Sequence, residues 1–442
     1  MDALGRVLAV FRRYPTVAVS LFIILTLIGI SIYAMISIPL SEAVALWNAP
    51  GEVWRHTPQL AQPTWTNLFR REKLPRTTIV RMDDFESITE ALSETTWRET
   101  TLLTFDYDYS TLPNEITLFY NISYDTKLPL VTLTWSKPDG SEIRLFRGTK
   151  GGGPARLEID PAEVLGESQQ AEMDPESPGD DREPRAVKGE YSLRVEVLIF
   201  EAEGFSMSGQ LDVFGRVYGI SGTDDQRRNL TIALLWGTPL ALMIGLIAAT
   251  GTTVFGFVVA AIGSWCGGWV DATIQRITEV SMMIPFLPTI LMVGWFYSSS
   301  IWVLLIFIIG FSLFSGPLKS YRAMFLQVKG SQYIEAAQAY GASNTRIIFR
   351  YLIPRMIPAL LPRLILGIPL FVFLETSLAF LGISDPHLPT WGKILSEARE
   401  ALYMGHYHWV LGPVLMLFLT GLSFSMLGYT LDRIFNPRLR DR

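Results

Sequence analysis

Long apolar runs alternate with polar stretches along this chain. Six segments are almost wholly apolar, at about 17–40, 235–263, 281–297, 301–317, 358–382 and 409–431. Each approaches the length of about 20 residues that a helix needs to cross a hydrocarbon layer of about 30 Å. The pattern predicts an all-α polytopic membrane protein with six spanning helices.

The first apolar segment follows Arg6, Arg12 and Arg13. Its apolar core is longer than the ~15 residues of a signal-peptide core, so we expect a retained helix and not a cleaved leader. Residues 1–44 are therefore predicted to hold an N-terminal tail and the first spanning helix.

A different pattern fills residues 45–228, between the first and second apolar segments. Alternating residues rich in Ile, Val, Tyr and Thr predict strands at 115–125, 128–137, 141–148, 191–203 and 208–220. Pro138-Asp139-Gly140 lies between two of them and is typical of a hairpin turn. These residues predict a large β-rich insertion.

Two stretches of the insertion are predicted to be irregular. Residues 165–185 hold seven acids and two bases, which favours a disordered acidic loop because little surface can be buried there. The sequence GTKGGGPAR (148–156) lacks the Gly-Lys-Ser/Thr ending of a phosphate-binding loop, so a flexible connector is expected.

Composition agrees with a membrane protein, because only 18% of the residues are charged and 49% are hydrophobic. Soluble proteins carry about 25% charged residues. A net charge of −5 gives no indication of nucleic-acid binding, and the single Cys266 excludes an internal disulfide. The closest approach to a ligand pair is His406 with His408, and neither a metal nor a cofactor is expected.

The loop charges predict the orientation in the membrane. From Lys319 to Arg363 there are seven Lys/Arg and one acid, whereas 384–408 has two bases and three acids. Basic loops stay in the cytoplasm, so the first of these is predicted to be cytoplasmic and the second external. With six spans, both termini are expected in the cytoplasm and the insertion outside it.

The basic loop contains a patterned segment at 331–354. Ser331 is a plausible N-cap of a short helix, and Gly341 stands where a left-handed C-cap is expected. A second helix is predicted to restart after Ser343, and Pro354 is predicted to bend the chain back toward the bilayer. The result would be a compact helix–turn–helix.

This segment resembles the cytoplasmic signature of the membrane permease subunits of ABC importers. Matching positions in register are Glu335, Ala336, Ala337, Gly341, Ile353 and Pro354, while Tyr351 departs from the usual isoleucine or histidine. The resemblance extends to the dipeptide/oligopeptide C-type through GTDD (222–225), ETSLAFLGI (375–383), TWGKILSEAR (390–399) and NPRLR (436–440). In addition, GGWVDATIQRITEV (267–280) looks like a cytoplasmic loop of that group, so a loop is expected there. Arg227-Arg228-Asn229 departs from the usual Gly-Arg-Asp, and the insertion is much longer than the family leads us to expect.

The resemblance implies a type I ABC importer transmembrane fold, with a permease core at 229–442 and a cytoplasmic coupling helix at 331–354. In such a subunit Glu335 would bond to a cytoplasmic ATPase, Ala336 and Ala337 would allow close seating, and Gly341 would permit the bend. The implied partners are a second, B-type permease, two cytoplasmic ATP-binding subunits and an extracytoplasmic solute-binding protein. The chain would then be an inner-membrane transporter subunit and not an enzyme, with ATP hydrolysed by its partners.

The residues leave three questions open. Glu375, inside the fifth span, either lies near a translocation path or is bonded by neighbouring hydroxyl groups such as those of Thr376 and Ser377. The chain as a whole could instead be a membrane-anchored sensor or binding protein, or a permease for a non-peptide solute such as nickel or an oligosaccharide. The insertion could dock the binding protein, which we favour, contact the partner permease, or cap the pore.

Overall fold

The computed structural model describes residues 14–49, 51–149, 151–166, 185–201 and 204–435. The chain forms two compact units, one of residues 49–231 and one of residues 1–48 together with 232–442. Most of the acidic stretch at 165–185, the arginines at 6, 12 and 13, and the NPRLR motif lie outside the described residues.

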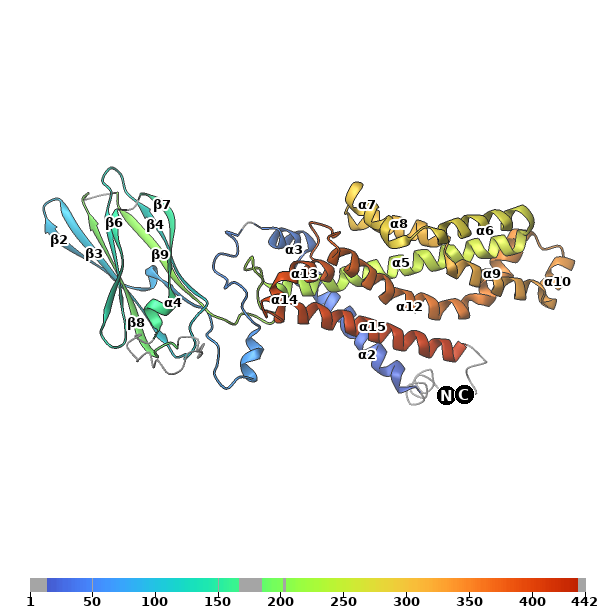
Figure 1. The fold of residues 1–442 in the computed structure, drawn as a ribbon, viewed down its shortest axis with the longest axis horizontal. Coiled ribbons are helices and arrows are strands. Elements are labelled where there is room, and N and C mark those ends of the chain that lie inside the picture. Colours follow the sequence, from blue (N-terminus) through green and yellow to red (C-terminus); the bar gives the residue numbers. More distant parts are fainter. Residues whose placement is uncertain (1–13, 50, 150, 167–184, 202–203, 436–442) are drawn as a thin grey trace, which may run out of the picture. The chain divides into compact units, whose positions relative to one another are not determined.

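The first unit, which we call the β unit, contains two antiparallel sheets (Figure 1). A four-stranded sheet has the order β1-β9-β4-β7, and a five-stranded sheet has the order β2-β3-β8-β5-β6. The strands are β1 Thr78–Arg81, β2 Ser87–Ser93, β3 Thr96–Tyr107, β4 Glu115–Ser123, β5 Leu130–Ser136, β6 Glu142–Thr149, β7 Gly153–Ile159, β8 Gly189–Ile199 and β9 Ser206–Phe214. A short helix, α4 (Pro161–Leu165), follows β7.

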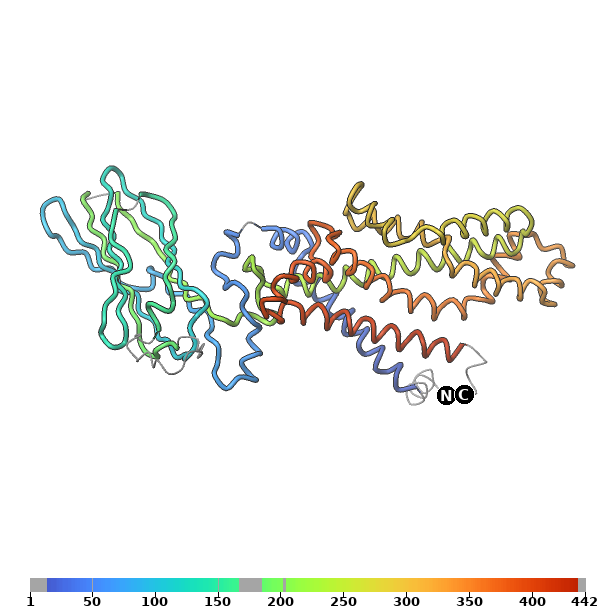
Figure 2. Tube along the Cα trace, in the orientation of Figure 1, coloured from blue at the N-terminus to red at the C-terminus, as the bar shows by residue number. Residues whose placement is uncertain are grey.

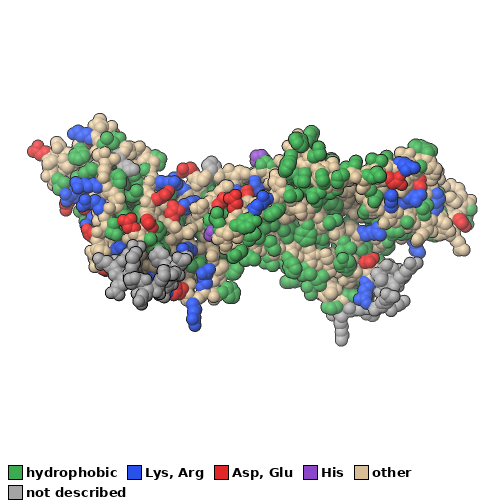
Figure 3. Space-filling model, in the orientation of Figure 1, with side chains coloured by type: hydrophobic (Ala, Val, Ile, Leu, Met, Phe, Trp, Pro, Cys, Tyr) green, Lys and Arg blue, Asp and Glu red, His purple; other side chains and the backbone are tan. Residues whose placement is uncertain are grey.

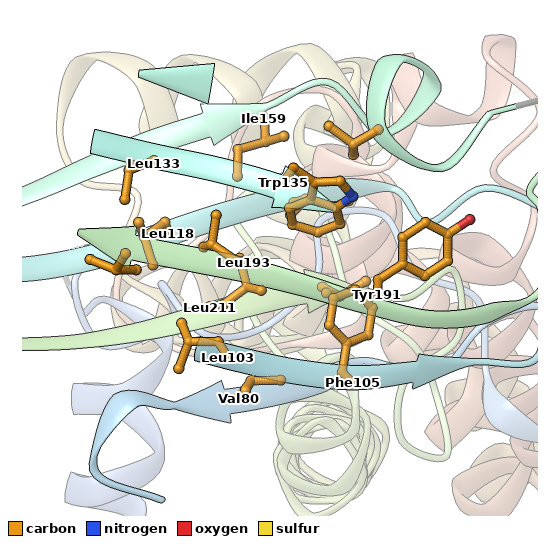
Figure 4. Packing of buried hydrophobic residues seen from close by; sticks show 14 of the residues in the cluster. Val80, Leu103, Phe105, Leu118, Leu133, Trp135, Ile159, Tyr191, Leu193 and Leu211 are labelled. Atoms are coloured by element: carbon orange, nitrogen blue, oxygen red, sulfur yellow. The ribbon is translucent and has the colours of Figure 1, made fainter. Parts of the chain in front are cut away.

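The two sheets share one hydrophobic core. Side chains alternate between buried and partly exposed along β5 and β8, as expected when one face of each strand is packed. Figure 4 shows Leu103, Phe105, Leu133, Trp135, Tyr191 and Leu193 of the five-stranded sheet beside Val80, Leu118, Ile159 and Leu211 of the other. The ring of Phe105 stacks on Tyr191 at 5.9 Å and meets Trp135 edge-on at 5.7 Å.

All five segments expected to be strands contain one, namely β4, β5, β6, β8 and β9. The sequence reading missed β1, β2, β3 and β7. The flexible connector expected at 148–156 is wrong in large part, because β6 runs to Thr149 and β7 begins at Gly153. Pairing of β7 with β4 along its whole length provides the backbone hydrogen bonds that order this glycine-rich stretch.

The second unit, which we call the helical unit, consists of helices whose surface is largely hydrophobic on the face shown in Figure 3. In Figures 1 and 2 its long helices run roughly alongside one another. They are α2 Pro15–Ser37, α3 Leu40–Trp47, α5 Leu230–Cys266, α6 Gly268–Met283, α7 Phe286–Phe296, α8 Ile301–Leu313, α9 Gly316–Lys329, α10 Gln332–Ala339, α11 Asn344–Arg346, α12 Ile353–Phe380, α13 Trp391–Glu397, α14 Arg399–Tyr403 and α15 His408–Phe435.

Among the described residues, four helices are long and apolar enough to cross a membrane: Pro15–Ser37, Leu230–Cys266, Asn344–Phe380 and His408–Phe435. Two bent pairs, α6 with α7 and α8 with α9, would raise the number to six if each pair were one span. The pairs bend by 77° and 45°.

The bent pairs correct two sequence expectations. The stretch 267–280, expected to be a loop, is the helix α6, and the spans expected at 281–297 and 301–317 are broken near Pro285 and Ser315. Helix α6 accommodates its polar residues because Asp271 accepts a hydrogen bond from Arg322 Nε of α9 at 2.7 Å. A helix with a polar face is easily mistaken for a loop in the sequence when the charged residue that pairs with that face is unknown.

Small residues bring the helices of this unit close together, as is common between membrane helices. A Cβ on Gly245 of α5 would lie 2.8 Å from the Ile368 carbonyl oxygen of α12, and one on Gly421 of α15 would lie 2.7 Å from Phe373 Cζ. At the other end of α5, Trp391 of α13 is buried over Gly237, and its Nε1 donates to the Leu234 carbonyl at 3.1 Å.

We predict that Gly237→Ala lowers the unfolding free energy of the protein in detergent by about 1–3 kcal/mol, the usual cost of overpacking. The added Cβ would lie 2.2 Å from Trp391 Cδ1, and this buried indole has little room to move. Thermal or denaturant unfolding of the full chain measures the change.

The matched control is Gly310→Ala in α8, where an added Cβ meets nothing within 4 Å. Alanine favours a helix over glycine by about 0.5–1 kcal/mol, so this variant should be neutral or slightly stabilised. Equal melting of the two variants would contradict the packing of Trp391 on Gly237.

Candidate functional site: an exposed helix and its support

The sequence-predicted signature forms a short helix, α10, whose two faces differ. Ile334 and Ala337 are buried, whereas Glu335 and Ala336 are exposed. Ser331 takes the N-cap position, but its hydroxyl donates to the Val328 carbonyl at 2.5 Å and does not cap the helix. One face of α10 is thus fixed to the protein, and the other is open.

The turn after α10 requires a glycine. Gly341 has φ +74, in the left-handed region that disfavours residues with a Cβ. Its N–H donates to the Gln338 carbonyl at 2.9 Å, and Ala342 N donates to the Ala337 carbonyl at 3.0 Å. These bonds close the end of α10, as was predicted for this position.

The second helix begins after Ser343, whose hydroxyl accepts from Arg346 N at 3.4 Å. The bend predicted at Pro354 is wrong. Helix α11, a π-helical segment (Ile347–Leu352) and α12 form one helix from Asn344 to Phe380. Ile353 N donates to the carbonyl of Ile348, five residues back, and this wider turn carries the helix past Pro354 without a break.

A cluster of buried residues supports α10 and the helix that follows it. Ile334 of α10 packs with Phe257 of α5, Phe325 of α9 and Ile347, Ile348 and Leu352 of the following helix. The same cluster includes Trp265 near the end of α5. Helix α10 is therefore seated on three other helical segments and is not a free loop.

Polar contacts at the end of α5 complete this support. Lys329 Nζ donates to the carbonyls of Ser264 at 2.9 Å and Trp265 at 2.8 Å, which otherwise end the helix unpaired. Its ammonium also lies 5.4 Å from the Trp265 ring. Trp265 Nε1 in turn donates to Asn344 Oδ1 at 3.1 Å, so the last turn of α5 holds both α9 and α11.

The open face of the segment carries an aromatic residue that the sequence reading did not single out. Tyr340, directly before Gly341, has 92% of its surface exposed. Phe349 on the next helix is 51% exposed. Exposed aromatic side chains beside a basic loop are typical of protein contact surfaces. The aromatic residue directly before the turn glycine is the sequence feature that could have identified this surface.

Glu375 of α12 is buried in the helical unit, where Thr390 and Thr376 hydrogen-bond to its carboxylate. A Cβ on Gly392 of α13 would lie 3.0 Å from Glu375 Oε2. The cavity beside it measures only about 10 Å³ and is otherwise lined mainly by aliphatic side chains. In this conformation Glu375 connects α12 with the start of α13, and Ser377 bonds elsewhere, to the Phe373 carbonyl.

The loop between α12 and α13 also holds α8. Asp385, which lines the same cavity, accepts from the backbone N of Ile301 at 3.3 Å and of His387 at 3.0 Å. A carboxylate is favourable at the N-terminus of a helix. Two acidic side chains therefore organise this end of the helical unit.

In the β unit, a groove of about 820 Å³ is lined by residues from the start of the unit, β4, β7 and residues 225–228. Arg227 and Glu115 form an ion pair there, as do Arg55 and Glu52. Arg227 adopts φ +65 in the position where the resembling family usually has glycine. Its guanidinium, 4.7 Å from the Phe214 ring, offsets part of the strain.

A polar pair of a buried aspartate and a partly exposed histidine lies next to this groove. His56 Nδ1 is 2.6 Å from Asp212 Oδ2, and Gln210 donates to Asp212 Oδ1 at 2.7 Å. Burial raises the pKa of Asp212, while the bonds from His56 and Gln210 act in the opposite direction. The pair fixes residues near 56 to β9. Across the described ranges, no group of three or more His, Cys, Asp or Glu side chains could hold a metal ion.

Comparison with known proteins assigns the helical unit. Residues 241–441 match the family described as "Binding-protein-dependent transport system inner membrane component". The chain is 28% identical to a dipeptide transport system permease protein of Alkalihalophilus pseudofirmus, over 50% of this chain and 72% of that protein. It is 29% identical to a glutathione transport system permease protein of Pectobacterium atrosepticum, over 50% and 72%. A peptidoglycan transport system permease protein of Agrobacterium fabrum is 31% identical over 41% and 48%. Residues 241–441 thus match the binding-protein-dependent transport inner membrane component family, and the proteins that this chain resembles there are transport system permeases.

Proposed function

We propose that this chain forms half of the translocation pathway of an ATP-driven importer of peptides. The relatives named for dipeptide and glutathione transport support peptides as the substrate class. The second half would be a B-type permease, and an extracytoplasmic binding protein would deliver the substrate. Two cytoplasmic ATP-binding subunits would hydrolyse ATP, so the chain itself would not be an enzyme.

The observation that carries the proposal is the exposed face of α10 on a rigid support. Glu335 and Ala336 face outward, while Ile334 fixes the helix to α5 and α9. A short helix held in this way transmits a displacement that a flexible loop would absorb. Ala337 faces inward, so in this proposal it allows close packing of α10 on the protein, and Ala336 with Tyr340 contacts the ATPase.

The membrane topology proposed here counts each bent pair as one span, which gives six spans and places both termini in the cytoplasm. The basic segment that includes α10 would then face the ATPase, and the β unit would lie outside the cytoplasm. A bend within a span is tolerated where neighbouring helices satisfy its backbone groups.

For Glu375 we propose a positioning role beside the pathway. Its bonds to Thr390 and Thr376 tie α12 to the loop before α13, and a carboxylate within a spanning helix is retained only with such partners. Movement of α12 would therefore be passed to α13, and through Trp391 of α13 to α5, on which Trp391 packs.

A second candidate function is a membrane-anchored sensor, which the separate β unit with its own core would suit. Uptake of a labelled dipeptide by the assembled importer in vesicles separates these functions, and competition by unlabelled peptide, Ni²⁺ or an oligosaccharide identifies the substrate class. ATP-dependent uptake that peptide alone inhibits is expected. Absence of uptake by an intact assembly, or inhibition by Ni²⁺ alone, would contradict the proposal.

We predict that Gly341→Val reduces ATP-driven uptake about tenfold while membrane insertion is unchanged. The substitution forces a β-branched residue into φ +74, at a cost of about 1–2 kcal/mol, and about 1.4 kcal/mol corresponds to a tenfold change in population. Uptake into vesicles and the amount of inserted protein are measured together.

Gly330→Val is the matched control, because Gly330 also has open space around it but has φ −83. It should keep most of the uptake. If both valine variants transported equally well, the left-handed turn would have no part in coupling.

A cross-linking prediction tests which face of α10 meets the ATPase. In a Cys266→Ser background, Ala336→Cys should react with a bifunctional reagent and join the chain to an ATP-binding subunit, since Ala336 is exposed. Ala337→Cys, on the buried face, should react at least about tenfold less, because buried thiols are inert. Cross-links from position 337 alone would reverse the assigned orientation.

A further inference from the structure

An apolar turn projects from the β unit and takes no part in its core. It consists of Trp65, Leu68, Phe69 and Ile220. Leu68 and Phe69 are each 82% exposed, Ile220 is 72% exposed and Trp65 is 47% exposed. Exposed side chains of this size that gather on one turn mark a contact with a membrane or another protein.

The turn is held rigidly in its exposed position. Residues Thr64–Leu68 form a 3-10 helix, and the side chain of Asn67 bonds to both the N–H and the carbonyl of Leu74, which is itself buried. Trp65 Nε1 donates to the Ile220 carbonyl at 2.9 Å, and the Trp65 ring meets Phe69 edge-on at 6.4 Å. The backbone therefore directs Leu68 and Phe69 away from the unit.

The base of the turn is bonded to the segment 219–222, which in turn is bonded to Leu230 of the same unit. Thr64 N and Oγ1 both donate to the Gly219 carbonyl, at 2.9 Å and 2.8 Å. Two residues beyond Ile220, the Gly222 carbonyl accepts from Leu230 N at 3.2 Å. Leu230 is the first residue of α5, and the helix is apolar from that point. Ile220 is thus two residues, or about 7 Å of extended chain, from Gly222, which is hydrogen-bonded to the first residue of α5.

The flank of the turn is basic. Arg70, Arg71 and Lys73 follow Phe69 directly and are exposed, with Glu72 as the acid among them. Arg70 donates to Gln62 Oε1 at 3.1 Å, and Glu72 Oε2 accepts from Ser110 at 3.4 Å. Aromatic and aliphatic side chains beside basic ones suit the boundary between lipid headgroups and acyl chains.

From these contacts we infer that the apolar turn inserts into the lipid leaflet that faces the β unit, with Arg70, Arg71 and Lys73 against anionic headgroups. The occupant is lipid because the turn is hydrogen-bonded to the segment that leads into the apolar helix α5 and because its flank complements acidic headgroups. The inference needs only that α5 crosses the bilayer, and it does not depend on the transported substrate. The turn would attach the β unit to the membrane in addition to the two points at which its chain continues into helices.

The test places an environment-sensitive fluorophore on the full-length chain in vesicles of phosphatidylethanolamine and phosphatidylglycerol. In a Cys266→Ser background, one variant carries the label at Phe69→Cys and its control at Ile88→Cys, which is 63% exposed on β2 of the same unit. Both sites are exposed, so neither label disturbs the core.

At position 69 we expect blue-shifted emission and quenching by doxyl-labelled lipid at least about threefold stronger than at position 88, as for a group at the acyl boundary. Aqueous iodide should quench position 88 more strongly. Replacing Arg70 and Arg71 by glutamine should weaken the lipid quenching at position 69, and so should vesicles of phosphatidylcholine alone.

Equal iodide quenching at the two positions would overturn the inference. So would a label at position 69 that neither lipid nor iodide reaches, because that pattern indicates a protein surface on the turn. Lipid quenching that ignores both the arginine substitutions and the headgroup charge would contradict the role given to the basic flank.

Discussion

The arrangement of the helical unit depends on how the last turn of α5 is terminated. A helix end leaves carbonyls without partners, and here Lys329 supplies donors to two of them. The same turn presents Trp265 to Asn344, at the start of the long helix that contains α12. The end of α5 therefore fixes the end of α9 and the beginning of the next spanning helix at one point. Helix α10 lies between those two ends, so its position follows from theirs.

The sequence was sufficient for features that depend on local pattern. Apolar runs located the four helices that are long and apolar enough to cross a membrane, and the positive φ of Gly341 followed from its place after a short helix. Features that depend on partners far along the chain were missed. Asp271 made α6 look like a loop because Arg322 lies on another helix. Pro354 was expected to bend the chain, whereas the π-helical turn continues the helix past it. The hydrophobic periodicity of a sequence reveals neither a charged partner on another helix nor the width of a helical turn.

The β unit shows the same division. The five strands found in advance carry clear alternation, whereas β7 contains two residues, Gly153 and Pro154, that disfavour strands. Its pairing with β4 outweighs that propensity. Arg227 is a comparable case, since a residue with a Cβ keeps a left-handed conformation through Glu115 and Phe214. In the candidate site, likewise, the sequence motif located the short helix α10. It did not show that Ala337 faces inward and Tyr340 outward.

Helix α12 contains three prolines inside its length, Pro358, Pro362 and Pro369. Each lacks the N–H that would otherwise bond to the carbonyl four residues earlier, so three rungs of the helical ladder are missing. Such a helix bends at lower energetic cost than an unbroken one. The helix that starts beside α10 and reaches Glu375 is consequently compliant along its middle. A push at one end would arrive at the other partly as a change in curvature rather than as pure translation.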